Sequence, residues 1–377
     1  MRKILKWTLI TFVSILSIAL ITGILFINIS PQFGGKATEE ELQAYSLTGH
    51  FDEGVFLNKE EIKMEVDCHS IQKMLQEMLE PDPNVSPKED IKVKKIEAAS
   101  IVQKPDSISR LTWFGHSTFL VEMDGKNILF DPVFGQYAAP HPLLGRKRYN
   151  SEMPISIADL PQIDAVIISH DHYDHLDYES IKELKEKTEH FFVPLGVDNH
   201  LERWGIAEDK ISKMDWWQEK EFNGLTIAFT PSRHMSGRGL TDQSATLWGS
   251  WVLQGKSSNI FFSGDGGYGK HFKEIGDKYG DFDIALMECG QYNKLWAQVH
   301  MMPEQTVQAG IDVKAKMIVP IHWGAFTLAS HSWTDPIERV TKAAQEMSVE
   351  IATPQIGEPI ILGEEDIPKT NWWTANQ

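Results

Sequence analysis

The chain has 377 residues, which is enough for one large domain or two ordinary domains. It carries 36 basic and 53 acidic side chains, so its formal charge is -17, and such a surface disfavours binding to nucleic acid. Two cysteines, Cys68 and Cys289, exclude a disulfide framework and a cysteine-rich zinc module.

The first thirty residues form a distinct apolar unit. Arg2, Lys3 and Lys6 precede residues 7–29, which carry no charge and are mostly aliphatic. At about 1.5 Å per residue, such a helix spans a hydrocarbon core of about 30 Å. We therefore predict that residues 1–30 are a single-pass membrane anchor, with the rest of the chain outside the cytoplasm because the basic residues precede the helix. The alternative is a long, cleaved signal peptide.

Residues 31–106 are predicted to be a linker and a helical preamble. Apolar residues recur at helical spacing over Lys59–Leu79, and the proline-rich stretch Pro81–Pro87 ends that pattern. Asp67-Cys68-His69 resembles a metal-binding fragment, but it lacks partner ligands at usable spacing and is interpreted as a chance cluster.

From residue 107 to residue 365 short apolar runs alternate with turns, which predicts one folded domain followed by a tail over 366–377. Asp124-Gly125 between two runs indicates a hairpin. The pattern favours an α/β sandwich of two facing sheets with helices outside. The predicted strands are Ser117–Met123, Asn127–Phe130, Ala165–Ser169, Phe191–Pro194, Leu225–Thr230, Thr246–Leu253, Asn259–Ser263, Ile284–Glu288 and Met317–Ile321. The predicted helices are Tyr178–Lys187, Val197–Trp204, Gly269–Tyr279, Pro303–Val313 and Trp333–Met347.

A cluster of metal-binding residue types directly follows a predicted buried strand. His170, His172, Asp174 and His175 stand within six residues just beyond Ala165–Ser169. Imidazoles with a carboxylate are ligands that suit Zn²⁺. Three further predicted strand ends carry His234, Asp265 and His322. Together these seven side chains suffice for two metal ions, with one bridging carboxylate and an open position for water.

These residues resemble the signature of the metallo-β-lactamase superfamily, and within it the family of N-acylphosphatidylethanolamine-hydrolysing phospholipases D. The similarity extends from about Arg110 to Gly363, and tryptophan-containing motifs narrow it to that family. The segments that carry it are Leu111–His116, Phe130–Pro132, Ile163–His170, Tyr173–Asp177, Asp215–Trp217, Leu247–Trp251 and Pro320–Gly324.

The resemblance implies an αβ/βα four-layer sandwich and a binuclear zinc site. It implies that one zinc ion is held by His170, His172 and His234, and the other by Asp174, His175 and His322, with Asp265 bridging the two. Tyr173 and His300 match positions that contact substrate in the family. The alternative for His300, which the pattern favours less, is a helix-capping or core histidine. His116 and Asp131 are expected to support the ligands or only to brace the fold.

The function predicted from these observations is that of a membrane-anchored hydrolase with two Zn²⁺ per chain. A hydroxide bridging the metals would attack a phosphodiester of N-acylphosphatidylethanolamine-like lipids, with Asp174 and Asp265 as catalytic residues. A zinc-dependent lactonase or esterase with another substrate is the alternative, because the fold hosts many substrates. A non-catalytic metal-binding protein and a redox di-iron enzyme are further alternatives. The expected partners are the lipid or ester substrate and the membrane, and a homodimer is compatible with the sequence.

Overall fold

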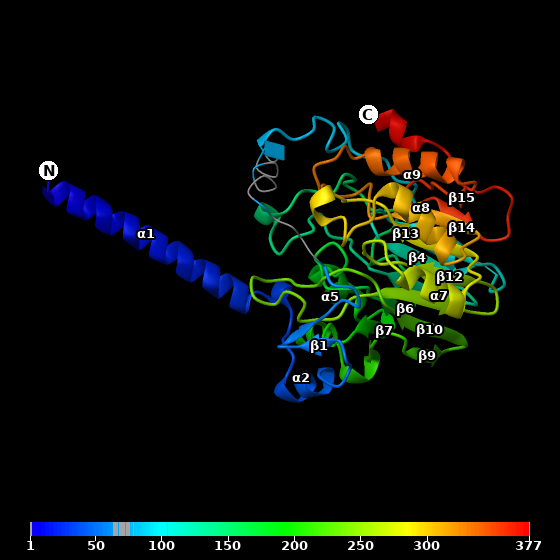
Figure 1. The fold of residues 1–377 in the computed structure, drawn as a ribbon, viewed down its shortest axis with the longest axis horizontal. Helices are drawn as coiled ribbons and strands as arrows, with labels where there is room; N and C mark the ends of the chain where they lie inside the picture. Colours follow the sequence, from blue (N-terminus) through cyan, green and yellow to red (C-terminus); the bar gives the residue numbers. More distant parts are fainter. Residues whose placement is uncertain are drawn as a thin grey trace.

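Two seven-stranded sheets form the body of the molecule (Figure 1). The computed structural model describes residues 2–62, 67, 72, 76–77, 79–103 and 105–376. The first sheet has the spatial order β16-β3-β4-β5-β6-β7-β8, with β3 (Arg110–Trp113), β4 (Phe119–Met123), β5 (Lys126–Phe130), β6 (Ile163–Ile167), β7 (Thr188–Pro194), β8 (Ile211–Met214) and β16 (Pro359–Ile361). The second has the order β15-β14-β13-β12-β11-β10-β9, with β9 (Glu219–Phe222), β10 (Leu225–Thr230), β11 (Ser250–Gln254), β12 (Asn259–Phe262), β13 (Ile284–Glu288), β14 (Met317–Ile321) and β15 (Glu350–Ile351).

The two sheets pack face to face and helices cover their outer faces. Phe130 of β5 and Phe262 of β12 meet with ring centroids 4.9 Å apart, and the Trp251 indole donates to the Ile168 carbonyl at 2.9 Å. Helices α7, α8 and α9 lie on the second sheet, and α5 and α6 lie on the first (Figure 1). The predicted four-layer αβ/βα sandwich is therefore confirmed. The helices are α1 (Arg2–Ile29), α2 (Glu39–Tyr45), α4 (Ala98–Val102), α5 (Tyr178–Leu184), α6 (Asp198–Arg203), α7 (His271–Tyr279), α8 (Pro303–Asp312) and α9 (Asp335–Glu346).

Most predicted elements appear within a few residues of their expected bounds. Strands β4 and β5 form the predicted hairpin, and Asp124 and Gly125 both have positive φ, as a two-residue turn of this kind requires. The strand predicted over Thr246–Leu253 starts only at Ser250, because Gly249 N donates to Ser169 O in the other sheet instead of to a neighbouring strand. Strands β3, β8, β9, β15 and β16 were not predicted. They are short, with two to four residues each, and β9 is in addition a polar edge strand without an apolar alternation.

Helix α1 projects from the body as a long apolar rod (Figure 1). Residues Lys3–Ile29 have a mean hydropathy of 2.6, and within the described chain this is the one helix long and apolar enough to cross a membrane. Its length and composition agree with the predicted anchor.

Segments on both sides of the predicted 107–365 domain contribute to its core. Tyr45, Phe56 and Ile91 from residues 31–106 are buried there, and a two-stranded ribbon, β1 (Phe51–Asp52) with β2 (Val55–Phe56), lies beside them. Trp372 and Trp373 of the C-terminal tail pack against Trp323. Most of the helix predicted over Lys59–Leu79, and Cys68 and His69, lie outside the described residues.

Candidate metal centre

The predicted ligands follow strands whose carboxyl ends meet at one edge of the two sheets. His170 follows β6, His234 follows β10, Asp265 follows β12 and His322 follows β14. Each of these four side chains is buried. The structure therefore brings together residues that are up to about 150 positions apart in the sequence. They lie beyond the carboxyl ends of strands in two mixed sheets, where α/β folds commonly bind ligands.

Three histidines make up the first group of candidate ligands. Nε2 of His170 lies 2.9 Å from Nδ1 of His172, and Nε2 of His234 lies 3.3 Å from the same atom. The other ring nitrogen of His234 donates to the Val299 carbonyl at 2.9 Å. That bond orients the ring so that Nε2 faces the other two imidazoles.

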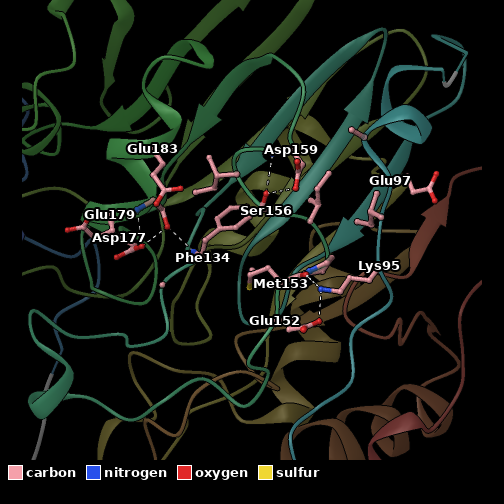
Figure 2. A pocket seen from close by; sticks show the side chains of 17 residues that line it. Lys95, Glu97, Phe134, Glu152, Met153, Ser156, Asp159, Asp177, Glu179 and Glu183 are labelled. Carbon is pink, nitrogen blue, oxygen red and sulfur yellow. Dashed lines mark hydrogen bonds and ion pairs between the residues drawn. The ribbon is translucent and has the colours of Figure 1, made fainter.

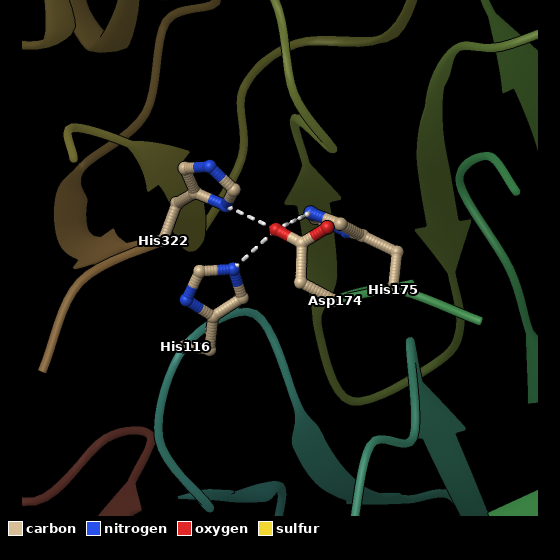
Figure 3. A group of neighbouring side chains, drawn as sticks. All are labelled: His116, Asp174, His175 and His322. Atoms are coloured by element: carbon tan, nitrogen blue, oxygen red, sulfur yellow. Dashed lines mark hydrogen bonds and ion pairs between the residues drawn. The ribbon is translucent and has the colours of Figure 1, made fainter. Parts of the chain in front are cut away.

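The second group surrounds Asp174 (Figure 3). Its Oδ2 lies 2.8 Å from Nε2 of His116, 3.5 Å from Nε2 of His175 and 3.9 Å from Nδ1 of His322. His116 therefore contacts a candidate ligand directly, as expected for a residue that supports the site. All four residues offer an atom within 4.8 Å of the others, so His116 itself is close enough to bind an ion.

Asp265 lies between the two groups. Its Oδ2 is 3.1 Å from Nε2 of His175 and 3.9 Å from Nε2 of both His170 and His234, and its Oδ1 is 3.1 Å from Nδ1 of His322. Gly264 makes this placement possible, because a Cβ at this residue would lie 2.6 Å from the Gly249 carbonyl. One carboxylate therefore reaches both groups of histidines.

The charge states of the cluster suit a divalent cation. Burial lowers the pKa of His170, His172, His234 and His322, so these imidazoles are neutral and can donate lone pairs. Burial disfavours the ionised forms of Asp174 and Asp265, but the surrounding histidines outweigh it and lower both pKa values. His175 is the exception, since the charges of Asp265 and Asp174 overcome burial and raise its pKa.

Two buried polar atoms at the centre are left without a hydrogen bond. Within the described part of the chain, Nε2 of His175 and Oδ1 of Asp265 have no hydrogen-bond partner. A buried polar atom without a hydrogen bond lowers the stability of the fold unless a ligand binds it. The donor set and these atoms fit a divalent metal ion of the kind bound by imidazole and carboxylate.

Asp131, at the end of β5, supports the loop that carries four of the candidate ligands. Its Oδ2 accepts from Nδ1 of His175 at 2.7 Å, and its Oδ1 accepts from the backbone of Ser169 at 2.7 Å. Since Nδ1 is engaged, the Nε2 of His175 points into the cluster. Asp131 thus contacts a candidate ligand instead of only bracing the strands.

Tyr173 and His300, the predicted substrate contacts, border the cluster and are only partly buried. The Tyr173 hydroxyl donates to the Arg238 carbonyl at 2.8 Å, and the Arg238 guanidinium lies 4.1 Å from the centre of its ring. The His300 ring lies 5.0 Å from that of His234 and 5.3 Å from that of His322.

Glu288 is a site residue that the sequence analysis missed. Its Oε1 lies 2.8 Å from Nδ1 of His300, and its Oε2 accepts from the backbone of Met301 at 3.0 Å. Burial raises the pKa of Glu288, while the bond to Glu288 outweighs burial and raises the pKa of His300, so the pair holds a proton near neutral pH. Its position as the last residue of a strand was a usable signal, since the other strand ends of this edge carry ligands.

Asn58 is a second missed residue. Its side chain brackets the backbone of His234, donating to the carbonyl at 2.7 Å and accepting from the amide at 3.0 Å. No local sequence signal marks this contact, because the two residues are 176 positions apart.

A surface cavity of about 800 Å³ lies beside the site and contains none of the seven candidate ligands (Figure 2). Its rim is mostly acidic, with Glu97, Glu152, Asp159, Glu179 and Glu183 facing the single basic residue Lys95. Asp177, which closes the ligand loop, lines it but accepts from the Ser180 backbone as the cap of α5. The cavity is therefore separate from the metal-binding cluster.

The fold and the cluster define a hydrolase of the metallo-β-lactamase fold. A family model for the beta-lactamase superfamily domain matches residues 126–323, which is just over half of the chain. The protein therefore belongs to the metallo-β-lactamase superfamily.

Known proteins similar to this chain include lipid hydrolases. An uncharacterised protein of Mycobacterium tuberculosis is 43% identical over 254 residues, covering 66% of this chain and 68% of that protein. The N-acyl-phosphatidylethanolamine-hydrolyzing phospholipase D 1 of Caenorhabditis elegans is 35% identical over 231 residues, covering 58% of this chain and 65% of the worm protein. The solved structure of Igni18, a metallo hydrolase of Ignicoccus hospitalis, has a TM-score of 0.51 at 22% identity and covers 68% of this chain and 100% of its own. That structural likeness concerns the fold.

Proposed function

We propose that this protein is a membrane-anchored zinc hydrolase of the phospholipase D type that cleaves N-acylphosphatidylethanolamine-like lipids. The observation that carries the proposal is the position of Asp265, whose two oxygens reach both groups of histidines. The similarity to the worm phospholipase D supports the choice of substrate, and the apolar helix α1 supports a location at the membrane.

Seven side chains would hold two zinc ions. His170, His172 and His234 would bind the first, and Asp174, His175 and His322 the second, with Asp265 bridging. Such ions, when bound, act as Lewis acids and lower the pKa of coordinated water. The two aspartates would supply negative charge that offsets the charge of bound ions, and the Asp265 carboxylate could accept a hydrogen bond from the attacking water.

His300 and Tyr173 would act on the substrate. Because Nδ1 of His300 is engaged by Glu288, Nε2 is the nitrogen that can donate to a phosphate oxygen. The raised pKa of His300 keeps that donor protonated, which favours an anionic substrate. Tyr173, which is partly buried at the border of the cluster, would contact the lipid near its phosphate.

The location of the anchor sets where the reaction takes place. Residues 1–30 would span the membrane once with the basic end in the cytoplasm, so the hydrolase domain over 107–365 would act on the outer leaflet. The tail over 366–377 packs on this domain through Trp372 and Trp373.

The test compares the purified full-length chain with Asp265→Asn, and Asp277→Asn on the exposed face of α7 serves as a matched control. Metal content and turnover are measured on N-acylphosphatidylethanolamine, other phosphodiesters and a panel of lactones. We expect two zinc ions per chain and release of the N-acylethanolamine, with both lost in Asp265→Asn and kept in Asp277→Asn. Turnover of lactones alone would assign the protein to a lactonase, bound zinc without any turnover would indicate a metal-binding protein, and little bound metal would refute the mechanism.

A further inference from the structure

The residues that follow α1 are fastened to the body beside the metal centre. We call residues 29–35 the strap. The Trp204 indole donates to the Pro31 carbonyl at 2.7 Å, Arg203 donates to the Ile29 carbonyl at 3.2 Å, and Arg238 donates through Nε to the Gln32 carbonyl at 2.8 Å. The end of the apolar helix is therefore held by side chains of the hydrolase domain.

One of these side chains, Arg238, also supports the loop that carries the candidate ligands. Nη1 of the buried Arg238 donates to the Leu176 carbonyl at 2.8 Å and also to the Asp171 carbonyl. Phe33 of the strap meets Tyr173 edge to face, with centroids 6.5 Å apart. Only the side chain of Tyr173 therefore separates Phe33 of the strap from the metal centre.

Close packing leaves the strap little freedom to move. A Cβ on Gly34 would lie 2.0 Å from Nδ1 of His200, and a Cβ on Gly35 would lie 2.0 Å from the Asn199 carbonyl. His200 in turn contacts Oδ2 of Asp171 at 3.1 Å. Because each contact is tight, the strap is held closely against the segment that contains Asn199 and His200.

Two loops next to the strap expose leucines to solvent. Leu143 and Leu144, in the short 3-10 helix η2 (Pro142–Leu144), are 88% and 66% exposed, and Leu240 is 83% exposed. The first loop reaches the apolar helix, since the His141 ring lies 6.2 Å from that of Phe26. The second begins at Arg238, which binds the strap.

We infer that Leu143, Leu144 and Leu240 form a docking surface for the lipid bilayer that α1 crosses. The inference rests on the proposed membrane anchoring of α1, and it does not depend on which lipid is cleaved. Large apolar side chains at loop tips gain free energy by entering the acyl boundary, and the exposed Arg146 and Lys147 beside them suit lipid phosphates. The formal charge of -17 disfavours a general electrostatic attraction, so the contact is apolar and local.

This surface explains how a lipid reaches the buried centre. The strap connects the membrane helix to the protein surface next to Tyr173. The three leucines would hold the neighbouring loops against the same leaflet. A phospholipid could then move from the bilayer past Tyr173 without crossing water, which would otherwise cost the hydration of its exposed acyl chains.

A spin label tests the surface directly. The full-length Cys68→Ser chain carries a nitroxide at Leu143→Cys, and it is reconstituted in vesicles of phosphatidylethanolamine and phosphatidylglycerol. Val102→Cys on α4 is the control. Val102 is 68% exposed, and α4 contacts Arg110 through Ser100. Arg110 begins strand β3, whose other end leads to His116 in the metal centre, so the control position lies at the far end of that strand. We expect the label at residue 143 to collide several-fold more with oxygen, relative to a water-soluble nickel chelate, than the label at residue 102. Equal accessibility at the two positions would overturn the inference whether or not the protein cleaves lipid.

A second measurement asks whether the surface serves catalysis. We expect Leu143→Ser/Leu144→Ser/Leu240→Ser to lose activity on lipid in vesicles several-fold, while activity on the same lipid in detergent micelles and the metal content stay unchanged. Val102→Ser should match the unmodified chain in both assays. An equal loss in vesicles and micelles would mean that the leucines support the fold, and it would contradict the docking role.

Discussion

His116 and His322 hold each other in place through their backbones. The His322 amide donates to the His116 carbonyl at 3.0 Å, and the two rings lie with centroids 4.2 Å apart. Both residues have positive φ, 53° and 65°, which side chains other than glycine rarely adopt. Such backbone strain persists only where surrounding contacts enforce it, and here it aims both imidazoles at Asp174.

Replacing His116 with Asn should weaken the second metal position. Asn tolerates positive φ, so the backbone is preserved while the bond from Nε2 to Oδ2 of Asp174 is lost. We expect the affinity of that position to fall about 10–100-fold, as measured by competition with a chromophoric chelator. His190→Asn, near the amino end of β7, is the control. Unchanged affinity in His116→Asn would show that His116 only braces the fold.

Replacing His300 with Gln should lower turnover without removing metal. If Nε2 of His300 donates to the substrate phosphate, its loss should reduce kcat by about 10²–10⁴-fold, the usual range for a proton-donating group. Metal content by mass spectrometry should stay at that of the unmodified chain. A loss of one ion per chain would instead make His300 a ligand.

Removal of metal should destabilise the fold. An ion that binds only the folded chain contributes about 4 kcal/mol when its concentration exceeds the Kd about 1,000-fold. We expect EDTA to lower the Tm in calorimetry by several degrees and added zinc to restore it. Asp265→Asn should show a smaller response to both treatments, whereas an unchanged Tm in the unmodified chain would argue against a metal that is bound in the folded state.

Acid should destabilise the protein partly through His271, the first residue of α7. Burial lowers the pKa of His271 to about 3, and the charges of Lys59 and Arg233 act in the same direction. Since the unfolded state binds the proton at a pKa of about 6.5, the stability that depends on neutral His271 is present above that pH. It is lost as the pH falls toward 3, at up to about 1.4 kcal/mol per pH unit.

His271→Gln should flatten this part of the stability profile. Denaturant unfolding at pH 7.5, 6 and 5 would measure the slope for both chains. The prediction is wrong if the unmodified chain and the variant lose stability equally over that range.

The sequence by itself determined the ligand loop and the layered fold. Residues 165–168 are continuously apolar and are followed by Ser169 and His170, so strand and ligands could be located from local pattern alone. The other ligands follow β10, β12 and β14, which run in the same direction in one sheet, so their carboxyl ends lie at one edge. Each strand and the ligand that follows it are close together in the chain, which is why a local pattern could reveal them.

Only the tertiary structure decided which residues orient the ligands. Asn58 on His234 and the strap on Arg238 are contacts between distant parts of the chain, and Glu288 contacts His300 across the loop that follows β13. Asparagine and arginine are common in loops, so nothing in the local sequence separates Asn58 or Arg238 from solvated neighbours. Glu288 differs, because its place as the last residue of β13 was a usable signal. The packing of the two sheets and the tight fit of Gly34 and Gly35 bring these groups together, because long-range contacts form only when the whole core does.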